Sequence, residues 1–353
     1  MGRDQRLTLD QSTRLQRTRL LGQGRALTIA LSDSELTKLT GVVLHDLRRL
    51  DLIEDLIPSS AQADCDYYEI PLAWFEQPAE VQDFLEIYLA CIDSISDFLT
   101  YFESICEIHK RRRKYSQILT SQPFPTMAQV GPRSLLEFGI IGDAALPSWL
   151  TWRKWLYDLD NRSAQETGYL FEPILATSLG GTPFGARNSP VKRTGDPSKG
   201  RQVDCIVGQD AYEFKLRVTI AASGQGRFRE ELEFAEDCAS SGFRPILLVL
   251  DPTPSSRLDE LKSEYAKYSG RAYIGNEAWS HLESESGPVM ATFVDKYVKE
   301  PIMSLDEHTN DLLDLELKYE SSSSQVALRL GGKGQNFALN IVRREDRTLS
   351  QDM

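Results

Sequence analysis

The sequence predicts a mixed α/β protein: a largely helical N-terminal region precedes a core that runs helix, three strands, helix, strand. Apolar residues recur every three or four positions through the first third of the chain, which is typical of amphipathic helices. From about residue 161, short alternating or continuous apolar runs bounded by glycine stand between helical stretches. We therefore expect a helical region over 1–145, a core over 146–300 and a C-terminal extension over 301–353.

In the first region, residues 31–57 and 79–118 have the apolar spacing of helices. The second stretch closes with the basic run 110–114. We interpret this run as a solvated helix C-terminus, where positive charge is favoured by the helix dipole, in preference to a phosphate contact. A segment interrupted by proline and glycine, 122–148, predicts a boundary.

Two helical features follow this boundary. Trp149, Trp152 and Trp155 recur at three-residue spacing, which favours a helix face buried in the core over a surface for stacking bases. The sequence from Ser163 to Glu166 has the pattern of a capping box, so we expect a separate helix to begin there and to run to about residue 178. Pro173 should kink that helix or reset its start.

The core continues with strands separated by glycine-containing turns. Residues 208–210 predict the turn of a hairpin, because glycine accepts the backbone angles of a tight turn. The tail after a serine linker, 321–324, has two alternating runs that predict a closing hairpin. The expected strands are 182–187, 202–207, 211–220, 244–250, 326–330 and 337–342, and the expected helices of the core are 227–240 and 254–268.

Composition limits the class of protein. A chain of 353 residues with 41% hydrophobic residues can bury a core of ordinary size, and it has no apolar run near the ~20 residues that span a bilayer. The N-terminus lacks an apolar signal segment. Five cysteines without a Cys-x-x-Cys pair favour reduced thiols over a disulfide framework or a zinc site. We expect a cytoplasmic protein with no membrane partner.

The net charge of −12 argues at first against a nucleic-acid partner, which usually requires a basic surface. Residues 230–320, however, contain twenty acidic and eight basic residues and account for the whole surplus. Residues 1–30 carry six basic and two acidic residues, and residues 183–229 carry nine and four. Two segments of the chain are therefore basic, and DNA is not excluded.

The residues most suited to chemistry are Asp204, Glu213 and Lys215. Glu213 and Lys215 are two positions apart on a strand and share one face. A hairpin that turns about residues 208–209 places Asp204 opposite Glu213. Two carboxylates with open coordination positions suit Mg²⁺, and a lysine beside them can orient or deprotonate a water that attacks a phosphate. The alternative is an ordinary hairpin with a surface Glu/Lys pair.

This arrangement resembles the PD-(D/E)XK nuclease superfamily, which has Asp at the end of the second strand and Glu-x-Lys in the third. Val203 stands where the name-giving proline would be. The run that ends in Glu172 resembles the helix carboxylate of the superfamily, and Glu166, which we assign to the capping box, is its rival.

The resemblance implies a role for each site residue. Asp204, Glu213 and the main-chain carbonyl of Phe214 would hold Mg²⁺, and Lys215 would position the water. Glu172 would support the metal or the lysine. Other nuclease chemistries need nearby histidines, and none lies between residues 110 and 280.

Residues 166–301 further resemble type II restriction endonucleases of the ApaLI family, in particular at 199–205, 221–227 and 250–253. The resemblance implies a restriction-endonuclease-like fold and hydrolysis of double-stranded DNA at a short palindrome, giving 5′-phosphate ends. It also implies a homodimer, because a two-fold site is matched by a two-fold protein, and a companion DNA methyltransferase in a restriction-modification system. A repair or junction-resolving nuclease and a catalytically silent DNA-binding protein are the alternatives.

DNA contacts are assigned only by charge and residue type. Residues 224–226 are either a strand-to-helix turn or the start of a helix that binds phosphate through backbone amides and the two arginines after it. The candidates are Arg187, Lys192, Arg193, Lys199, Arg201, Arg227 and Arg229.

Overall fold

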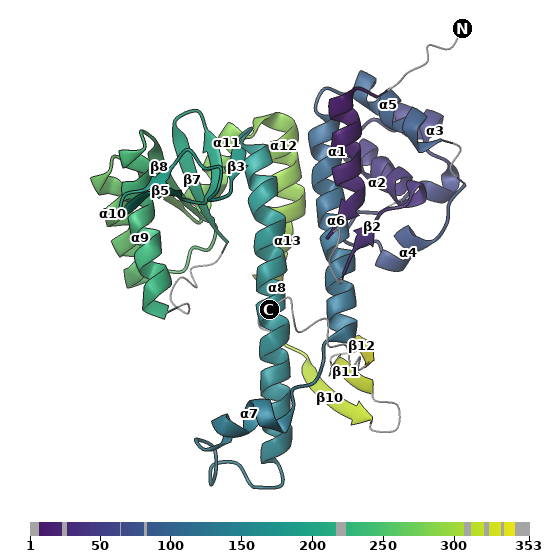
Figure 1. The fold of residues 1–353 in the computed structure, drawn as a ribbon. Helices are drawn as coiled ribbons and strands as arrows, with labels where there is room; N and C mark the ends of the chain where they lie inside the picture. Colours follow the sequence, from purple (N-terminus) through teal and green to yellow (C-terminus); the bar gives the residue numbers. More distant parts are fainter. Residues whose placement is uncertain are drawn as a thin grey trace. The chain divides into compact units, whose positions relative to one another are not determined.

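A computed structural model gives the fold of the chain as a mixture of helices and sheets, as the sequence predicts (Figure 1). It describes residues 7–22, 27–63, 65–80, 83–216, 224–306, 312–320, 325–332 and 335–342, with backbone alone for 224–227, 320, 325, 332 and 335–342. The chain forms two compact units. Unit 1 comprises 1–98, 102–167 and 307–353, and unit 2 comprises 99–101 and 168–306.

Unit 1 is built around α2 (Asp33–Asp46), of whose fourteen residues ten are buried. Ser32 and Glu35 form the capping box that begins this helix, each side chain accepting a hydrogen bond from the other residue's backbone amide. The predicted helix 31–57 is therefore present, but it is divided at Arg48, whose φ is 55°. The other helices and strands that precede α8 are α1 (Leu9–Arg19), β1 (Leu20–Leu21), β2 (Ile29–Ala30), α3 (Leu50–Leu56), η1 (Ser59–Ala61), α4 (Leu72–Glu76), α5 (Phe84–Ser94), α6 (Phe98–Ser121) and α7 (Met127–Ser134).

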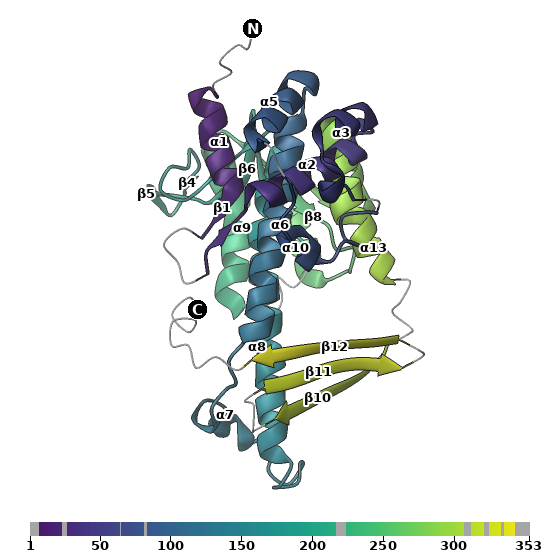
Figure 2. The ribbon, with the colours of Figure 1, turned by 90° about the vertical axis from the view of Figure 1, so that its right-hand side faces the viewer.

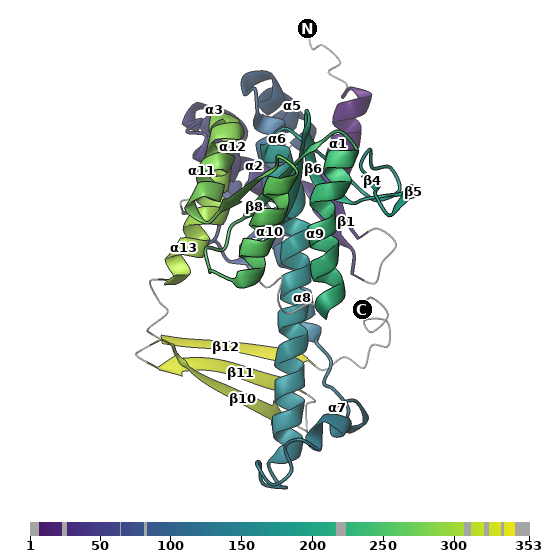
Figure 3. The same ribbon diagram turned by 90° about the vertical axis from the view of Figure 1, so that its left-hand side faces the viewer.

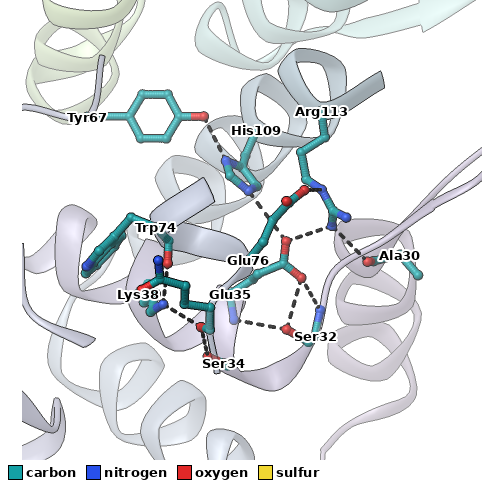
Figure 4. Close-up of polar contacts among 11 residues, drawn as sticks. Ala30, Ser32, Ser34, Glu35, Lys38, Tyr67, Trp74, Glu76, His109 and Arg113 are labelled. Carbon is teal, nitrogen blue, oxygen red and sulfur yellow. Dashed lines mark hydrogen bonds and ion pairs between the residues drawn. The ribbon is translucent and has the colours of Figure 1, made fainter. Parts of the chain in front are cut away.

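A buried polar network ties α2 to α6 (Figure 4). Arg113 donates to Glu35 at 2.7 Å, and His109 Nε2 lies 3.7 Å from the same carboxylate oxygen. On its other side His109 Nδ1 lies 3.0 Å from the hydroxyl of the fully buried Tyr67. Burial acts to raise the pKa of Glu35, but the contacts with His109, Ser32 and Arg113 outweigh it, and the pKa is lowered. The carboxylate of Glu35 is thus held in its charged form.

The prediction that the basic run 110–114 is a solvated helix end is wrong. Helix α6 continues to Ser121, and Lys110 is completely buried. The Lys110 ammonium donates to the carbonyls of Arg17 and Leu20, at the end of α1, and to Glu107. Lys110 is internal because it pairs with Glu107 and donates to carbonyls at the end of α1, all within unit 1.

The expectation of a separate helix from residue 163 is also wrong, because α8 runs without interruption over Leu146–Ser178. Residues 156–162 include neither glycine nor proline that would stop it, and the carbonyl of Ser163 accepts from the hydroxyl of Thr167 as in a helix interior. Pro173 lies inside α8 and does not reset its start. Glu166 accepts from Arg111 at 2.8 Å and from Lys114 at 2.6 Å, so it is not a capping residue.

The predicted tryptophan stripe lies on α8, although only Trp155 is fully buried and Trp149 is 46% exposed. Trp155 stacks on Phe124 and packs against Val326 of a C-terminal sheet. Figure 2 shows this sheet beside the N-terminal part of α8. It contains the predicted closing hairpin and one further strand, in the order β10 (Asp314–Glu320), β11 (Gln325–Gly332), β12 (Gln335–Val342). The predicted linker 321–324 lies outside the described residues.

Unit 2 contains a five-stranded sheet in the order β3-β6-β7-β8-β9. The first three strands pair antiparallel and the last three parallel. Together with α8 and α9, the first four of these strands have the predicted order helix, three strands, helix, strand. Residues 217–220 of the third expected strand lie outside the described residues. The strands are β3 (Thr182–Phe184), β6 (Val203–Val207), β7 (Asp210–Lys215), β8 (Arg244–Val249) and β9 (Arg271–Ile274), with a separate pair β4 (Lys192–Arg193) and β5 (Asp196–Gly200).

Two helices, α9 (Gly224–Ser240) and α10 (Ser256–Lys267), run side by side against β8 (Figure 3). They bury Phe234, Leu261 and Tyr265 against the sheet. The later helices of unit 2 are α11 (Asn276–Glu285), α12 (Gly287–Val294), η3 (Asp295–Lys299) and α13 (Glu300–Asp306). Across the part of the chain that the structure describes, no helix has the length and apolarity needed to cross a bilayer.

Candidate active site

The site is built on the β6–β7 hairpin, whose register is the expected one. Val207 pairs with Asp210 and Cys205 with Tyr212, which places Asp204 at the next position, opposite Glu213. Gly208 begins the two-residue turn with a φ of 58°, a left-handed conformation that glycine adopts without steric cost. The hairpin thus brings to one place two carboxylates that are nine positions apart in the chain.

The carboxylate of Asp204 is fixed by the backbone of the neighbouring strand. Its Oδ2 accepts a hydrogen bond of 2.9 Å from the amide of Phe214, and the residue is only 8% exposed. The Asp204 side chain thus accepts a hydrogen bond that a backbone carbonyl of β6 would accept in a regular sheet. The described backbone pairing of the two strands ends at Cys205. In an extended strand, the N–H and the C=O of one residue point toward the same edge of the strand. The Phe214 carbonyl therefore points toward the edge where Asp204 lies.

Lys215 lies between two carboxylates. Its ammonium donates to Glu213 Oε1 at 2.5 Å and to Glu231 Oε1, on α9, at 2.9 Å. All three side chains are about one-fifth exposed or less. The sequence did not reveal Glu231, because its place beside Lys215 depends on how α9 packs over the sheet.

The carboxylates of the site repel one another. Burial is the largest cause that raises the pKa of Asp204, and the charges of Glu213 and Glu172 raise it further. The pKa is well above its usual value. Burial acts to lower the pKa of Lys215, but the charges of Glu213 and Glu231 outweigh it and the pKa is raised. With Glu213 and Glu231 beside it, Lys215 is therefore protonated, and its ammonium can orient a water and stabilise negative charge.

The two rival helix carboxylates, Glu172 and Glu166, lie in different surroundings. Burial, and next the charge of Glu213, raise the pKa of Glu172, while Lys215 lowers it. Glu172 is therefore close enough to the hairpin to interact electrostatically with the site. Glu166 is instead paired with Arg111 and Lys114 in unit 1.

A small cavity of about 190 Å³ opens onto the carboxylates. Asp204, Glu213 and the Phe214 carbonyl supply hard oxygen donors, and the mutual repulsion of the acids is what a bound cation would relieve. Within the described residues, no three His, Cys, Asp or Glu side chains form a metal site on their own. Mg²⁺ keeps several waters and uses one or two carboxylates, so two acids and a carbonyl are a donor set that suits it. The cavity is lined by Arg193, Arg201, Gln202, Asp204, Glu213, Glu230, Glu231 and Phe234.

A larger hollow, of about 1030 Å³, lies between the β4–β5 pair and α9. Five of the seven predicted DNA-binding residues line it: Arg187, Lys192, Arg193, Lys199 and Arg229. The structure does not bring Arg201 to this surface. It is 7% exposed, and its guanidinium donates to the carbonyl of Glu230 and lies 3.4 Å from Asp237. The side chain of Arg227 lies outside the described part of the chain.

Comparison with known proteins shows the family of the chain. The model of the ApaLI-like restriction endonuclease family matches residues 56–299. The chain is 44% identical to "Type II restriction enzyme ApaLI" of Acetobacter pasteurianus over 369 aligned positions, which cover 99% of this chain and 97% of the relative. No solved structure matches the chain. The family match covers more than half of the chain and the similarity to the relative nearly all of it, so the chain belongs to the ApaLI-like family of restriction endonucleases.

Proposed function

We propose that this site-specific restriction endonuclease hydrolyses double-stranded DNA at a short palindrome in a Mg²⁺-dependent reaction that leaves 5′-phosphate ends. The observation that carries the proposal is the convergence of Asp204, Glu213 and Lys215 on the β6–β7 hairpin of a chain that belongs to this family. Membership of the family favours this function over a repair nuclease or a silent DNA-binding protein.

Asp204, Glu213 and the Phe214 carbonyl would hold the cation, and Glu172 would support the metal or the lysine from α8. A Mg²⁺ ion held there would supply a Lewis acid for the phosphate and would lower the pKa of a water. The protonated Lys215 orients the attacking water and stabilises the negative charge that builds on the phosphate oxygens. Asp204 needs little reorganisation, because the Phe214 amide already holds it.

The overall reaction is a substitution at phosphorus. The water oxygen forms a new bond to phosphorus, and the bond from phosphorus to the 3′ oxygen breaks. The 3′ oxygen leaves with a proton as a hydroxyl group, and the phosphate stays on the 5′ side. No oxidation or reduction takes place, and the chain contributes positioning and charge.

DNA phosphates would lie against the hollow beside the β4–β5 pair. Its cations now have acidic partners: Lys199 lies 2.9 Å from Asp196, and Arg229 lies 2.9 Å from Glu233. Exposed pairs of this kind contribute roughly 0–1 kcal/mol, so DNA phosphates can displace the carboxylates at little cost. We keep Arg227 as a candidate contact and leave out Arg201, which is buried against α9.

A homodimer follows from the symmetry of the proposed target. One chain contains one Asp204–Glu213–Lys215 site, and cutting both strands of a palindrome uses two such sites related by a two-fold axis. In the cell, the host's own target sites would be protected by a companion DNA methyltransferase of a cytoplasmic restriction-modification system.

The test is digestion of a sequenced plasmid by the purified protein with Mg²⁺, followed by mapping of the fragment ends. We expect discrete fragments with 5′-phosphates, and Lys215→Ala or Asp204→Ala should abolish cleavage while DNA binding is largely kept. Lys267→Ala, which removes a lysine of α10 paired with Glu264, is the control and should cleave normally. A smear of fragments would contradict sequence specificity, and full cleavage by the Lys215 variant would contradict the site.

A further inference from the structure

Glu231 is the one acidic side chain outside the predicted set that contacts the site lysine in the described part of the chain. It lies on α9, sixteen positions after Lys215, and it lines the same small cavity as Asp204 and Glu213. Its side chain is 21% exposed. A half-buried carboxylate in contact with a lysine is thus part of the site wall, although neither the hairpin pattern nor the family motif points to it.

The carboxylate of Glu213 has two possible partners, the Lys215 ammonium and a cation. In the structure its Oε1 accepts from the Lys215 ammonium at 2.5 Å, whereas the proposed function assigns the same carboxylate to the cation. When Glu213 turns toward a cation, Lys215 loses its shorter hydrogen bond. A lysine side chain has four rotatable bonds and would then sample several rotamers. The Glu231 contact at 2.9 Å comes from a different element and does not depend on where Glu213 points.

We propose that Glu231 is a positioning residue: it anchors the Lys215 ammonium from α9, so that Glu213 can turn to the cation while the lysine stays directed at the attacking water. This inference rests on the proposed function. It assigns Glu231 neither to the metal nor to the DNA. The orientation of Lys215 depends on the hydrogen bond and not on the negative charge alone, because a hydrogen bond is directional.

The proposal predicts an order among variants. Glu231→Gln keeps a side-chain oxygen of nearly the same reach as an acceptor, so it should retain part of the rate. Glu231→Ala removes the acceptor and should slow single-turnover cleavage roughly 10- to 100-fold, the usual effect of losing a partner that orients an active-site group. The apparent Kd for DNA should change by less than about threefold. Glu264→Gln removes the carboxylate charge of a Glu–Lys pair on α10 and is the matched control, expected to behave as wild type.

The experiment measures single-turnover rates across a Mg²⁺ titration, together with DNA binding by fluorescence anisotropy in Ca²⁺ and thermal unfolding of each variant. A rate loss in Glu231→Ala that persists at saturating Mg²⁺, with unchanged DNA affinity and partial retention in Glu231→Gln, supports the proposal. Wild-type rates in Glu231→Ala overturn it. Recovery of the rate at high Mg²⁺ overturns it in favour of a metal ligand, and an equal loss of DNA affinity overturns it in favour of a DNA contact. Absence of any cleavage by the wild-type protein contradicts the proposed function instead.

Discussion

Removing the guanidinium of Arg113 should strongly destabilise unit 1. Glu35 is 4% exposed, and in Arg113→Met its carboxylate loses a hydrogen bond of 2.7 Å. Removal of one partner from a buried ion pair costs about 3–5 kcal/mol, because the remaining charge is left uncompensated. Glu35 keeps the amide and hydroxyl of Ser32 at 2.8 and 2.9 Å. We therefore expect the lower end of that range, about 3 kcal/mol at pH 8.

The pH dependence of this loss has a definite sign. Burial lowers the pKa of His109 and outweighs the contact with Glu35, which raises it. The charge of Arg113 lowers the pKa further. In the folded wild type His109 is therefore neutral at pH 8, and it opposes folding when the pH falls below its unfolded pKa of about 6.5. Without Arg113 the pKa of His109 rises, and its protonated ring can neutralise Glu35. The destabilisation by Arg113→Met should thus be smaller at pH 5.5 than at pH 8.

Urea unfolding followed by tryptophan fluorescence tests this, because four of the five tryptophans belong to unit 1. Arg244→Met is the control: Arg244 makes two hydrogen bonds to the carboxylate of Asp210, one more than Arg113 makes to that of Glu35, but its side chain is 45% exposed. That variant should lose less than about 1 kcal/mol. A loss below about 1 kcal/mol in Arg113→Met at pH 8, or a loss that grows as the pH falls, would refute the reasoning.

Three further changes have expected outcomes. Gly181→Ala places a Cβ in a steric clash with the Cys205 sulfur, so overpacking should cost about 1–3 kcal/mol in thermal unfolding; an unchanged midpoint would contradict that contact. Trp155→Ala empties a fully buried position and should cost about 3–5 kcal/mol, measured by calorimetry; a loss under about 1 kcal/mol would argue against the packing with the C-terminal sheet. Lys110→Met removes the donor to the carbonyls at the end of α1 and should speed proteolysis of that helix, whereas equal digestion rates would count against the contact.

The parts of the fold that the sequence predicted correctly are those set by local physics. The turn at Gly208 fixes the β6–β7 register, because a glycine with positive φ begins a two-residue loop and every later pair then follows. Asp204 and Glu213 could therefore be placed opposite each other from the chain's own turn residues. The continuous apolar run of β8 was likewise recognisable as a strand buried by helices.

The errors arose where tertiary contacts override a local pattern. The sequence from Ser163 to Glu166 has the residue types of a capping box, but Glu166 is taken by two cations of α6, fifty-two and fifty-five positions away. The charge of Lys110 predicted a solvated residue, yet its ammonium is satisfied by two carbonyls of the chain near residue 20. Neither partner is visible from the local sequence.

The hydrogen bond from the Phe214 amide to Asp204 divides the site into a rigid and an adjustable half. The Asp204 carboxylate is hydrogen-bonded to a strand that β8 pairs with on its other edge, so its orientation is fixed by the sheet. In the part of the chain that the structure describes, the Lys215 ammonium is hydrogen-bonded to the carboxylates of Glu213 and Glu231, and all three groups belong to side chains that can rotate. In the proposed reaction, any rearrangement of the site would therefore be confined to a few side-chain torsions, with the sheet as a fixed frame.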